Sequence, residues 1–289
     1  MSSNTENKLK IALTGASGLV GSRIIELLKN DFEFISLPQE EVDITDREKV
    51  GQKLQGIDFD LFLHLAAYTN VDKAEKEEDL CYKINVEGTR NVFEETQKKN
   101  KKFIFISTDF VFNGKQPFYD EDSKPDAYFG VYGMSKLEAE KVVNGKAMIV
   151  RTSFPYRSSY DKRQDFVRSI KGLLEQGKPF TMVTDSIITP TFIDDIAYAL
   201  KHLFNNYSPD VFHLVGTQSL APREAGILIA EAFGLDKSLI GKTTFAKFHV
   251  GKAPRPQKSV IRSKKNNFYP MKSFKDGLAE VKKQLEASS

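Results

Sequence analysis

The amino-acid sequence predicts an α/β protein, in which a Rossmann-type doubly wound parallel sheet is joined to a smaller mixed α/β domain. Two observations carry this prediction. From Leu9 to Thr152, short apolar runs alternate with longer amphipathic runs, as βαβ units do when helices cover both faces of a parallel sheet. A glycine-rich turn follows the first apolar run and opens the first amphipathic one. The alternation ends after Thr152, where the second domain is expected to begin.

The apolar runs before Thr152 are the expected strands, and the amphipathic runs between them are the expected helices. The strands are Lys10–Thr14, Phe32–Ser36, Leu61–Leu65, Phe103–Ser107 and Ala147–Arg151. The helices are Leu19–Asn30, Arg47–Leu54, Leu80–Lys99 and Tyr132–Asn144. Asp46 is well placed to cap the second helix, because its carboxylate can accept hydrogen bonds from the first-turn N–H groups.

The second half of the chain contains fewer regular signals. Helices are expected near Asp165–Gln176 and at Pro222–Phe233, and the apolar run Val211–Val215 is expected to add a strand to the sheet. The Pro and Gly residues of Gly251–Ser259 predict a loop. We therefore assign residues 1–152 and about 189–216 to the larger domain, and about 153–188 and 217–289 to the smaller one.

Composition favours a soluble globular protein without a membrane span. The 289 residues include 22 Phe and are 40% hydrophobic, which is ample for a buried core. The net charge is +3 with both signs mixed, so the charge does not require a nucleic-acid partner. The single cysteine, Cys81, cannot form an intramolecular disulfide and fits a reducing cytoplasm. The leader Ser2–Lys8 lacks the apolar stretch of a signal peptide, and no run reaches the roughly 18 apolar residues that span a membrane.

Gly15, Gly18 and Gly21 occupy the turn between the first expected strand and helix. Such a turn predicts a dinucleotide site, because Gly15 permits a tight turn, Gly18 lets the backbone approach a diphosphate, and Gly21 lets helix and strand pack closely. The helix N-terminus then faces the phosphates. The spacing is G-x-x-G-x-x-G rather than G-x-G-x-x-G, and an ordinary βα turn is the alternative interpretation. On this motif we assign the larger domain to NAD(P) binding.

The sequence defines the adenosine end of this site less well. After the second strand, Ile35–Pro38 offers neither a carboxylate for the ribose 2′-hydroxyl of NADH nor an arginine for the 2′-phosphate of NADPH. Asp43 and Ile44 are suited to flank the adenine, but they are equally well explained as a loop aspartate and a core isoleucine. These residues leave the choice between NADPH and NADH open.

Tyr132 and Lys136 are four residues apart in an expected helix, so a phenol and an ammonium share one face. An ammonium near a phenol favours the phenolate and lowers the phenol pKa, which suits a proton donor near neutral pH. Thr108 stands at the end of an expected strand, and ligands bind beyond the carboxyl ends of parallel strands. Its hydroxyl can therefore meet Tyr132 at one substrate oxygen, although turn formation is the commoner role for such a residue.

These motifs, in this order, resemble the extended branch of the short-chain dehydrogenase/reductase superfamily. Within that branch, Ser107–Gly114, Arg151–Ser153, Thr189–Thr191 and Arg255-Pro256 are similar to the dTDP-4-dehydrorhamnose reductase family. The resemblance implies a cytoplasmic oxidoreductase that reduces a 4-keto sugar nucleotide with NADPH or NADH, at the last step of dTDP-L-rhamnose synthesis. It also assigns the smaller domain to substrate binding.

The resemblance implies a role for each matching residue. Tyr132 donates a proton to the ketone oxygen, Lys136 binds the nicotinamide ribose and lowers the pKa of Tyr132, and Thr108 polarises the carbonyl. Asn85 holds the local helix geometry and a water linked to Lys136. Cofactor contacts are expected from Gly15, Ser17, Gly18, Leu19, Val20, Asp43, Ile44, Leu65, Ala66, Ala67, Asn85, Tyr132 and Lys136, and substrate contacts from Thr108, Asp109, Phe110, Phe154 and Arg255.

Three departures from the family pattern fall on positions that are expected to contact the substrate. Phe110 stands where the family has Tyr, and Phe154 stands where it has Trp. The segment Thr184–Thr191 lacks the glycine of the family motif. These changes leave the residues for hydride transfer in place but leave the identity of the sugar open.

The late basic segment and the assembly of the protein give further expectations. Arg255, Ser259 and Lys264 are suited to the substrate diphosphate, unless this segment is only a solvated loop. We see no cluster of metal ligands in the sequence. A homodimer is among the expected assemblies.

Two other functions fit the same motifs. A 4,6-dehydratase is disfavoured because Phe110 occupies the position of its glutamate, whereas a sugar-nucleotide 4-epimerase of the same branch stays open. The second alternative is a catalytically silent, NADP-binding regulatory subunit. The beta subunit of methionine adenosyltransferase is similar in the Ser-x-Asp-x-Val-Phe and Arg-Pro segments.

Overall fold

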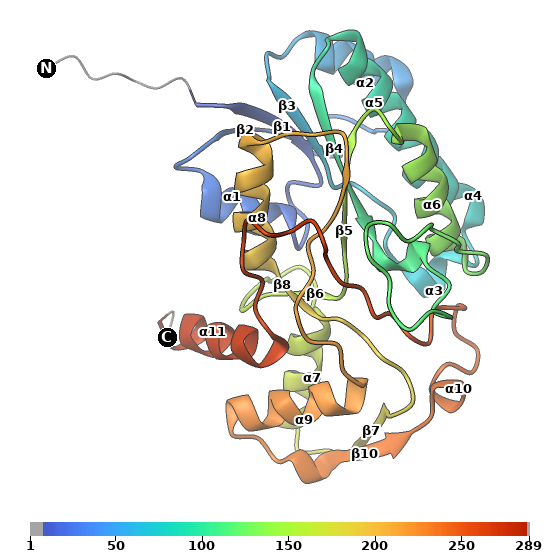
Figure 1. Ribbon diagram of the computed structural model, residues 1–289, viewed down its shortest axis with the longest axis vertical. Coiled ribbons are helices and arrows are strands. Elements are labelled where there is room, and N and C mark those ends of the chain that lie inside the picture. Colours follow the sequence, from blue (N-terminus) through green and yellow to red (C-terminus); the bar gives the residue numbers. More distant parts are fainter. Residues whose placement is uncertain (1–7, 288–289) are drawn as a thin grey trace, which may run out of the picture.

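The computed structural model describes residues 8–287, and its centre is a six-stranded parallel sheet in the order β2-β1-β3-β4-β5-β9 (Figure 1). The strands are β1 Lys10–Thr14, β2 Glu33–Leu37, β3 Leu61–His64, β4 Lys102–Thr108, β5 Met148–Thr152 and β9 Val211–His213. Thr108 pairs with Thr152 at the ends of β4 and β5. Both strands therefore deliver their last residues to the same edge of the sheet.

Helices cover both faces of the sheet (Figure 1). On one face lie α1 (Gly21–Leu28) and α8 (Ile193–Asn205), and on the other α2 (Arg47–Gln55), α5 (Thr89–Lys98) and α6 (Val131–Val143). Side chains alternate along each strand, so Ile11 and Leu13 enter the core beneath α1 and α8 while Ala12 enters the opposite core. The predicted α/β fold with a Rossmann-type parallel sheet is confirmed.

The rest of the chain forms a smaller mixed region with its own core, which includes Tyr156, Leu174 and Ile229. Its strand pairs are β6 (Pro155–Tyr156) with β8 (Thr191–Phe192), and β7 (Phe180–Val183) with β10 (Ile240–Thr243). Its helices are α7 (Phe166–Glu175), α9 (Pro222–Phe233), α10 (Phe245–Phe248) and α11 (Phe274–Ala287). Phe268 and Met271 return to the core of the large sheet, and the division into domains stays a prediction.

Most expected elements appear close to their expected bounds, and Asp46 caps α2 by accepting a hydrogen bond from the Lys49 N–H at 3.1 Å. The helix expected at Leu80–Lys99 is confirmed, but it contains a π-helical turn that the sequence does not predict. The segment is α4 (Glu78–Tyr82), a π-helical stretch at Lys83–Gly88 and then α5. The apolar period of such a short stretch does not separate a π turn from an α turn. The short α3 (Val71–Ala74) precedes α4.

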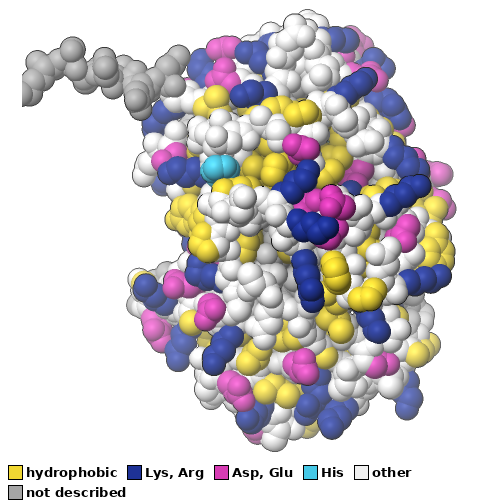
Figure 2. Space-filling model, viewed as in Figure 1, with side chains coloured by type: hydrophobic (Ala, Val, Ile, Leu, Met, Phe, Trp, Pro, Cys, Tyr) yellow, Lys and Arg dark blue, Asp and Glu magenta, His cyan; other side chains and the backbone are white. Residues whose placement is uncertain are grey.

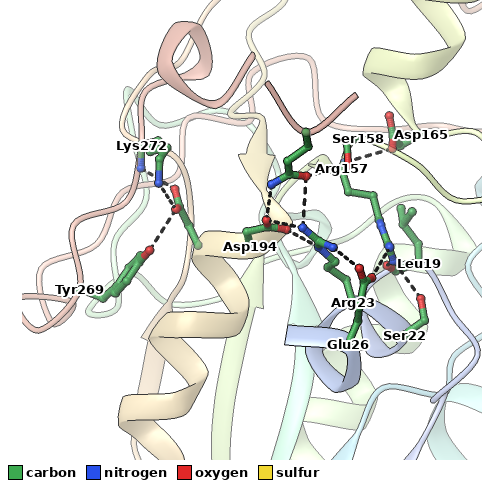
Figure 3. A network of polar contacts seen from close by, with 12 residues as sticks. Leu19, Ser22, Arg23, Glu26, Arg157, Ser158, Asp165, Asp194, Tyr269 and Lys272 are labelled. Carbon is green, nitrogen blue, oxygen red and sulfur yellow. Dashed lines mark hydrogen bonds and ion pairs between the residues drawn. The ribbon is translucent and has the colours of Figure 1, made fainter. Parts of the chain in front are cut away.

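Polar contacts beside α1 join the two regions (Figure 3). Arg23 of α1 donates from Nε and Nη2 to the two carboxylate oxygens of Asp194, at 2.7 Å each. Gln284 of α11 also donates to Asp194, at 2.7 Å. Arg157, in the loop after β6, donates to Glu26 of α1 at 2.8 Å. The helix that follows the glycine-rich turn is therefore fixed to the smaller region.

Basic and acidic side chains are interspersed on the face of the molecule drawn in Figure 2. No helix within residues 8–287 is long and apolar enough to cross a membrane. The leader considered in the sequence analysis lies outside the described residues, except for Lys8.

Candidate active site

The glycine-rich turn lies between β1 and α1, at the carboxyl edge of the sheet. Gly15 has a φ of +71°, and a Cβ atom there would come 2.9 Å from the Ala66 nitrogen. A Cβ atom at Gly21 would come 2.3 Å from the Gly15 carbonyl oxygen, so α1 begins directly against the turn. The Gly18 N–H closes the turn by donating to the same carbonyl at 3.0 Å. Glycine is thus required at positions 15 and 21 by conformation and space.

A cavity of about 510 Å³ opens on one side of this turn. Of the predicted cofactor residues, those that line it are Gly15, Ser17, Gly18, Asp43, Ile44, Leu65, Ala66 and Ala67. Asp43 Oδ1 accepts hydrogen bonds from the N–H and the hydroxyl of Thr45, both at 2.9 Å. Asp43 and Ile44 therefore lie on the cavity wall, and their contacts with adenine stay a prediction.

A larger cavity, of about 950 Å³, lies on the other side of the turn. The two cavities share the lining residues Gly15, Gly18, Leu65, Ala67 and Thr69, so they adjoin at this turn, and together they are called the cleft. The larger cavity brings together the predicted residues Val20, Thr108, Asp109, Phe110, Tyr132, Lys136, Phe154 and Arg255. Residues from distant parts of the chain therefore surround a single space.

Two predicted cofactor residues, Leu19 and Asn85, line neither cavity. Leu19 packs against the core beneath α1 and α8. Asn85 is buried in the π-helical stretch, where its Oδ1 accepts from the Tyr68 N–H at 2.8 Å and its Nδ2 donates to the Ser135 hydroxyl at 2.9 Å. Asn85 therefore ties the loop after β3 to α6 and positions the wall of the cleft.

Close packing of α6 on the turn after β4 brings Tyr132 to Thr108. A Cβ atom at Gly133 would lie 2.6 Å from the Phe110 carbonyl oxygen, so the glycine in this motif permits the approach. The Thr108 hydroxyl lies close enough to the Tyr132 phenol to act on its pKa. The Phe110 ring meets the Tyr132 ring edge to face, with centroids 5.5 Å apart. Two hydroxyls thus converge at one point of the larger cavity.

The electrostatics of the phenol differ from the expectation. Burial raises the pKa of Tyr132 above its ordinary value, and the nearby Thr108 hydroxyl acts in the opposite direction. The Lys136 ammonium donates to the Ile106 carbonyl at 2.8 Å and lies 3.9 Å from the centroid of the Phe105 ring. The expected lowering of the Tyr132 pKa by Lys136 is wrong for this arrangement, because burial dominates and the ammonium is held by a backbone carbonyl.

Burial also acts on the ammonium itself. Lys136 is 3% exposed, and burial lowers its pKa to about 7. A lysine with this pKa changes its charge near neutral pH, which is typical of a functional site rather than of a surface lysine.

Asp109 is buried beside this site and gathers three segments of the chain. Its carboxylate accepts hydrogen bonds from Thr108 at 3.1 Å, from Ser153 at 2.9 Å and from Ser259. These hydroxyls belong to the end of β4, the residue after β5 and the late loop. Burial raises the pKa of Asp109, whereas the three hydroxyl hydrogen bonds lower it. Asp109 therefore fixes the cavity wall from within.

The three residues predicted to contact the substrate diphosphate differ in their positions and partners in the structure. Arg255 lines the larger cavity and forms an ion pair with Asp72. Ser259 also lines it, but its hydroxyl is bonded to Asp109. Lys264 does not line it, because Asp120 and Asp122 hold its ammonium at 2.8 and 2.9 Å. The prediction for Lys264 is therefore wrong.

Phe154 faces the larger cavity from the loop between β5 and β6. Its φ is +41°, a left-handed conformation that is uncommon for a residue with a side chain. Its ring packs against Phe166 of α7, with centroids 6.0 Å apart. The residue that departs from the family pattern is thus held in an unusual backbone conformation at the cleft, as strained residues at binding sites often are.

Sequence reasoning missed several residues of the cleft. Arg163 and Thr69 line it, and the Arg163 Nη1 donates to the Thr69 hydroxyl at 2.9 Å. Tyr160, in the same loop as Arg163, donates to the Ser17 carbonyl at 2.6 Å. The loop contains no recognisable motif, so only its proximity in the fold reveals it.

The cleft also fits a dinucleotide by its unused polar groups. The hydroxyls of Ser107 and Thr152 are buried, line the larger cavity and have no hydrogen-bond partner among the described residues. Buried polar groups are rarely left without a partner, and these two hydroxyls would have to rotate toward the cavity to meet a ligand. Within residues 8–287, no group of three or more His, Cys, Asp or Glu side chains is arranged to hold a metal ion.

A Rossmann-type sheet whose carboxyl edge carries a glycine-rich turn, a threonine, a tyrosine and a lysine defines an oxidoreductase of the short-chain dehydrogenase/reductase superfamily. Comparison with known families agrees. The chain belongs to the family described as RmlD substrate binding domain, whose sequence model matches residues 9–287.

Individual relatives agree with this family. The spore coat polysaccharide biosynthesis protein SpsK of Bacillus subtilis is 31% identical over 258 residues, covering 87% of this chain and 88% of SpsK. A dTDP-4-dehydrorhamnose reductase of Sinorhizobium fredii is 32% identical over 220 residues, covering 72% and 73% of the two chains. The crystal structure of the Bacillus anthracis dTDP-4-dehydrorhamnose reductase in complex with NADP superimposes with a TM-score of 0.89 at 31% identity, covering 96% and 99%.

Proteins with the alternative functions are more distant. The methionine adenosyltransferase 2 subunit beta of Pongo abelii is 26% identical over 246 residues, covering 79% of this chain and 73% of that one. A UDP-glucose 4-epimerase of Thermotoga maritima has a TM-score of 0.82 at 20% identity, which shows a shared fold alone.

Proposed function

We propose that the protein is an NADPH-dependent reductase that converts the ketone of a 4-keto sugar nucleotide into an alcohol, with dTDP-4-dehydrorhamnose as its substrate. One observation carries the proposal. Thr108, Tyr132 and Lys136 line the same cavity as Gly15 and Gly18 of the glycine-rich turn. The relatives named dTDP-4-dehydrorhamnose reductase support the choice of sugar nucleotide.

Different residues of the cleft are suited to bind the cofactor and the substrate. The glycine-rich turn and the N-terminus of α1 are suited to the cofactor diphosphate, since backbone N–H groups and the helix dipole favour anions there. NADPH, when bound, supplies a hydride to the ketone carbon. The far wall of the larger cavity is apolar and aromatic, with Phe154, Phe166 and Phe245 among its residues, and it is suited to the rings of the substrate.

Proton transfer is assigned to Tyr132. Because burial raises its pKa, the phenol keeps its proton at neutral pH and can give it to the ketone oxygen. The Thr108 hydroxyl lines the same cavity and donates to Asp109 in this structure; on substrate binding it would turn to donate to the same ketone oxygen and stabilise the charge that develops there. Lys136, one helical turn further along α6, lines the same cavity and is suited to bind a ribose hydroxyl of the cofactor.

The proposal is tested by mixing purified protein with NADPH and dTDP-4-keto-6-deoxy-L-mannose and following the absorbance of the reduced nicotinamide. We expect oxidation of NADPH and formation of a dTDP-6-deoxyhexose with an alcohol at C4. A panel of other 4-keto sugar nucleotides tests the choice of sugar, and the Tyr132→Phe variant provides the inactive control. No NADPH oxidation with any member of the panel would refute the reductase assignment.

The similarity to the methionine adenosyltransferase beta subunit supports a second function, a regulatory subunit that binds NADP without turnover. Affinity purification of the chain from its native cells tests this function. Recovery of an adenosyltransferase in a stoichiometric complex, together with no reduction of any keto sugar nucleotide, would favour the regulatory role.

A further inference from the structure

The loop Arg157–Asp165, here called the bridging loop, comes from the smaller region and contacts the cofactor side of the cleft. Arg157 donates to the Ser22 hydroxyl of α1 at 3.0 Å, in the network drawn in Figure 3. Tyr160 donates to the carbonyl of Ser17, within the glycine-rich turn. The bridging loop therefore lies directly against the turn that we assign to the cofactor diphosphate.

The bridging loop is held in this position by Arg168 of α7. The Arg168 guanidinium donates to the carbonyls of Tyr160 and Arg163 and forms an ion pair with Asp165 at 2.8 Å. Asp165 in turn caps α7 by accepting from the Arg168 N–H at 3.0 Å. The backbone that presents Arg163 is thus fixed by several hydrogen bonds, and the Arg163 side chain starts from a defined place.

Arg163 is the arginine of the cleft without an acidic partner. Of the two arginines that line the larger cavity, Arg163 and Arg255, the second is paired with the Asp72 carboxylate. Within residues 8–287, Arg163 forms no ion pair, and its hydrogen bond goes to the neutral Thr69 hydroxyl. An arginine in this state keeps its full positive charge and most of its five donors for an anionic ligand.

The position of Arg163 along the cleft indicates which part of a ligand it meets. Thr69 lines both cavities, as Gly15 and Gly18 do, so this residue marks the passage between them. A dinucleotide that spans the cleft places its two nucleosides in the two cavities and its diphosphate in the passage. Arg163, bonded to Thr69, lies beside this passage, and it is also near enough to Tyr132 to act on the pKa of that phenol.

We propose that Arg163 binds the diphosphate of the cofactor from the side opposite the glycine-rich turn. The larger and the smaller region of the protein would then both contact the same anion. The inference rests on the proposed use of NADPH but not on the identity of the sugar. The sugar nucleotide carries a diphosphate of the same chemistry, and Arg255, further along the cavity, is left for it.

Binding constants of the isolated protein test this inference without any turnover. Arg163→Gln should weaken NADPH about tenfold or more, since a charge-assisted hydrogen bond is lost, as measured by the fluorescence of the bound nicotinamide. Adenosine 2′-monophosphate, which lacks the diphosphate, and dTDP, which represents the sugar nucleotide, should bind as before. Lys162→Gln is the matched control, because Lys162 is the neighbouring cation of the bridging loop and lines neither cavity.

Three results would overturn the assignment. Unchanged NADPH binding would remove Arg163 from the cofactor site, a loss confined to dTDP would assign it to the substrate diphosphate, and an equal loss for all three probes would indicate damage to the fold. Arg163→Lys keeps the charge but not the planar fork, and we expect it to bind NADPH with an affinity between those of the parent and Arg163→Gln. The binding measurements do not depend on turnover in the reductase assay, so either proposal can be refuted without refuting the other.

Discussion

The two walls of the cleft differ in how they are built. The wall at the edge of the large sheet carries Thr108, Tyr132 and Lys136, and buried hydrogen bonds hold these residues in place. The opposite wall is formed largely by aromatic and aliphatic side chains, including Phe166, Phe180 and Phe248. A site that must place a proton needs fixed polar groups, whereas a site that must hold a sugar nucleotide needs shape and apolar surface. The contrast separates the reaction from the choice of substrate.

The largest effect is expected on the sheet wall, from Tyr132→Phe. Removing the phenolic hydroxyl should reduce kcat by roughly 100-fold to 10,000-fold, because proton donation to the ketone oxygen is lost. NADPH affinity should stay close to that of the parent, as measured by nicotinamide fluorescence. Loss of cofactor binding instead would give Tyr132 a structural role and would remove the contrast between the walls.

The stability of the sheet wall should depend on the charge of Lys136. The pKa of Lys136 is about 7 in the folded protein, below the ordinary value of 10.5. Between these values the unfolded chain binds more protons than the folded one, so this lysine makes the protein less stable as pH falls from 10.5 to about 7. The methionine of the Lys136→Met variant does not titrate. At pH 7 the unfolding free energy of this variant should exceed that of the parent by roughly 1–3 kcal/mol. The variant should also lose turnover.

Urea unfolding of both proteins across this pH range measures the effect of Lys136. The advantage of Lys136→Met should shrink as pH rises and the buried amine of the parent becomes neutral in both states. If the difference in unfolding free energy between the two proteins does not change with pH, burial of the Lys136 charge is not the cause of the lower stability of the parent.

On the opposite wall, Arg255→Ala should change substrate binding rather than chemistry. We expect the KM for the sugar nucleotide to rise about tenfold and the KM for NADPH to change little, because one charge-assisted contact with a diphosphate is lost. Lys258→Ala, in the same loop, is the control, since Lys258 is not among the residues that line the larger cavity. Equal changes in both KM values would contradict the placement of Arg255 at the substrate.

The smallest expected effect concerns the ring at position 154. Phe154→Trp restores the larger ring of the family, and it should lower the KM for dTDP-4-dehydrorhamnose by a few-fold with kcat unchanged, since stacking area increases without touching the proton donor. Phe154→Leu should act in the opposite direction. If the tryptophan variant instead binds another keto sugar better, the natural substrate differs from the one proposed.

The fold was largely predictable because local periodicity specifies a parallel sheet with covering helices. The residues of the sheet wall were predictable for the same reason, since strand ends and helix faces place Thr108, Tyr132 and Lys136 at one edge. The pKa of Tyr132 was not, because sequence spacing does not reveal that the Lys136 ammonium is bound to the Ile106 carbonyl.

The opposite wall was harder to predict, because its residues come together only through tertiary contacts. Lys264 carries the charge expected of a phosphate ligand, yet two aspartates far away in the sequence hold it. Arg163 gives no signal in the sequence, and it enters the cleft because Arg168 fixes the loop that carries it. Charge and composition do not show which cations are already paired.

The carboxylate of Asp109 has a consequence for how such a protein can change over time. Thr108, Ser153 and Ser259 all donate to this one buried group, so the end of β4, the residue next to Phe154 and the loop of Arg255 share a common anchor. Replacing a ring at position 154 alters what fills the cavity but leaves the anchor in place. A change of the ring at position 154 is therefore expected to leave Tyr132, the proposed proton donor, in place.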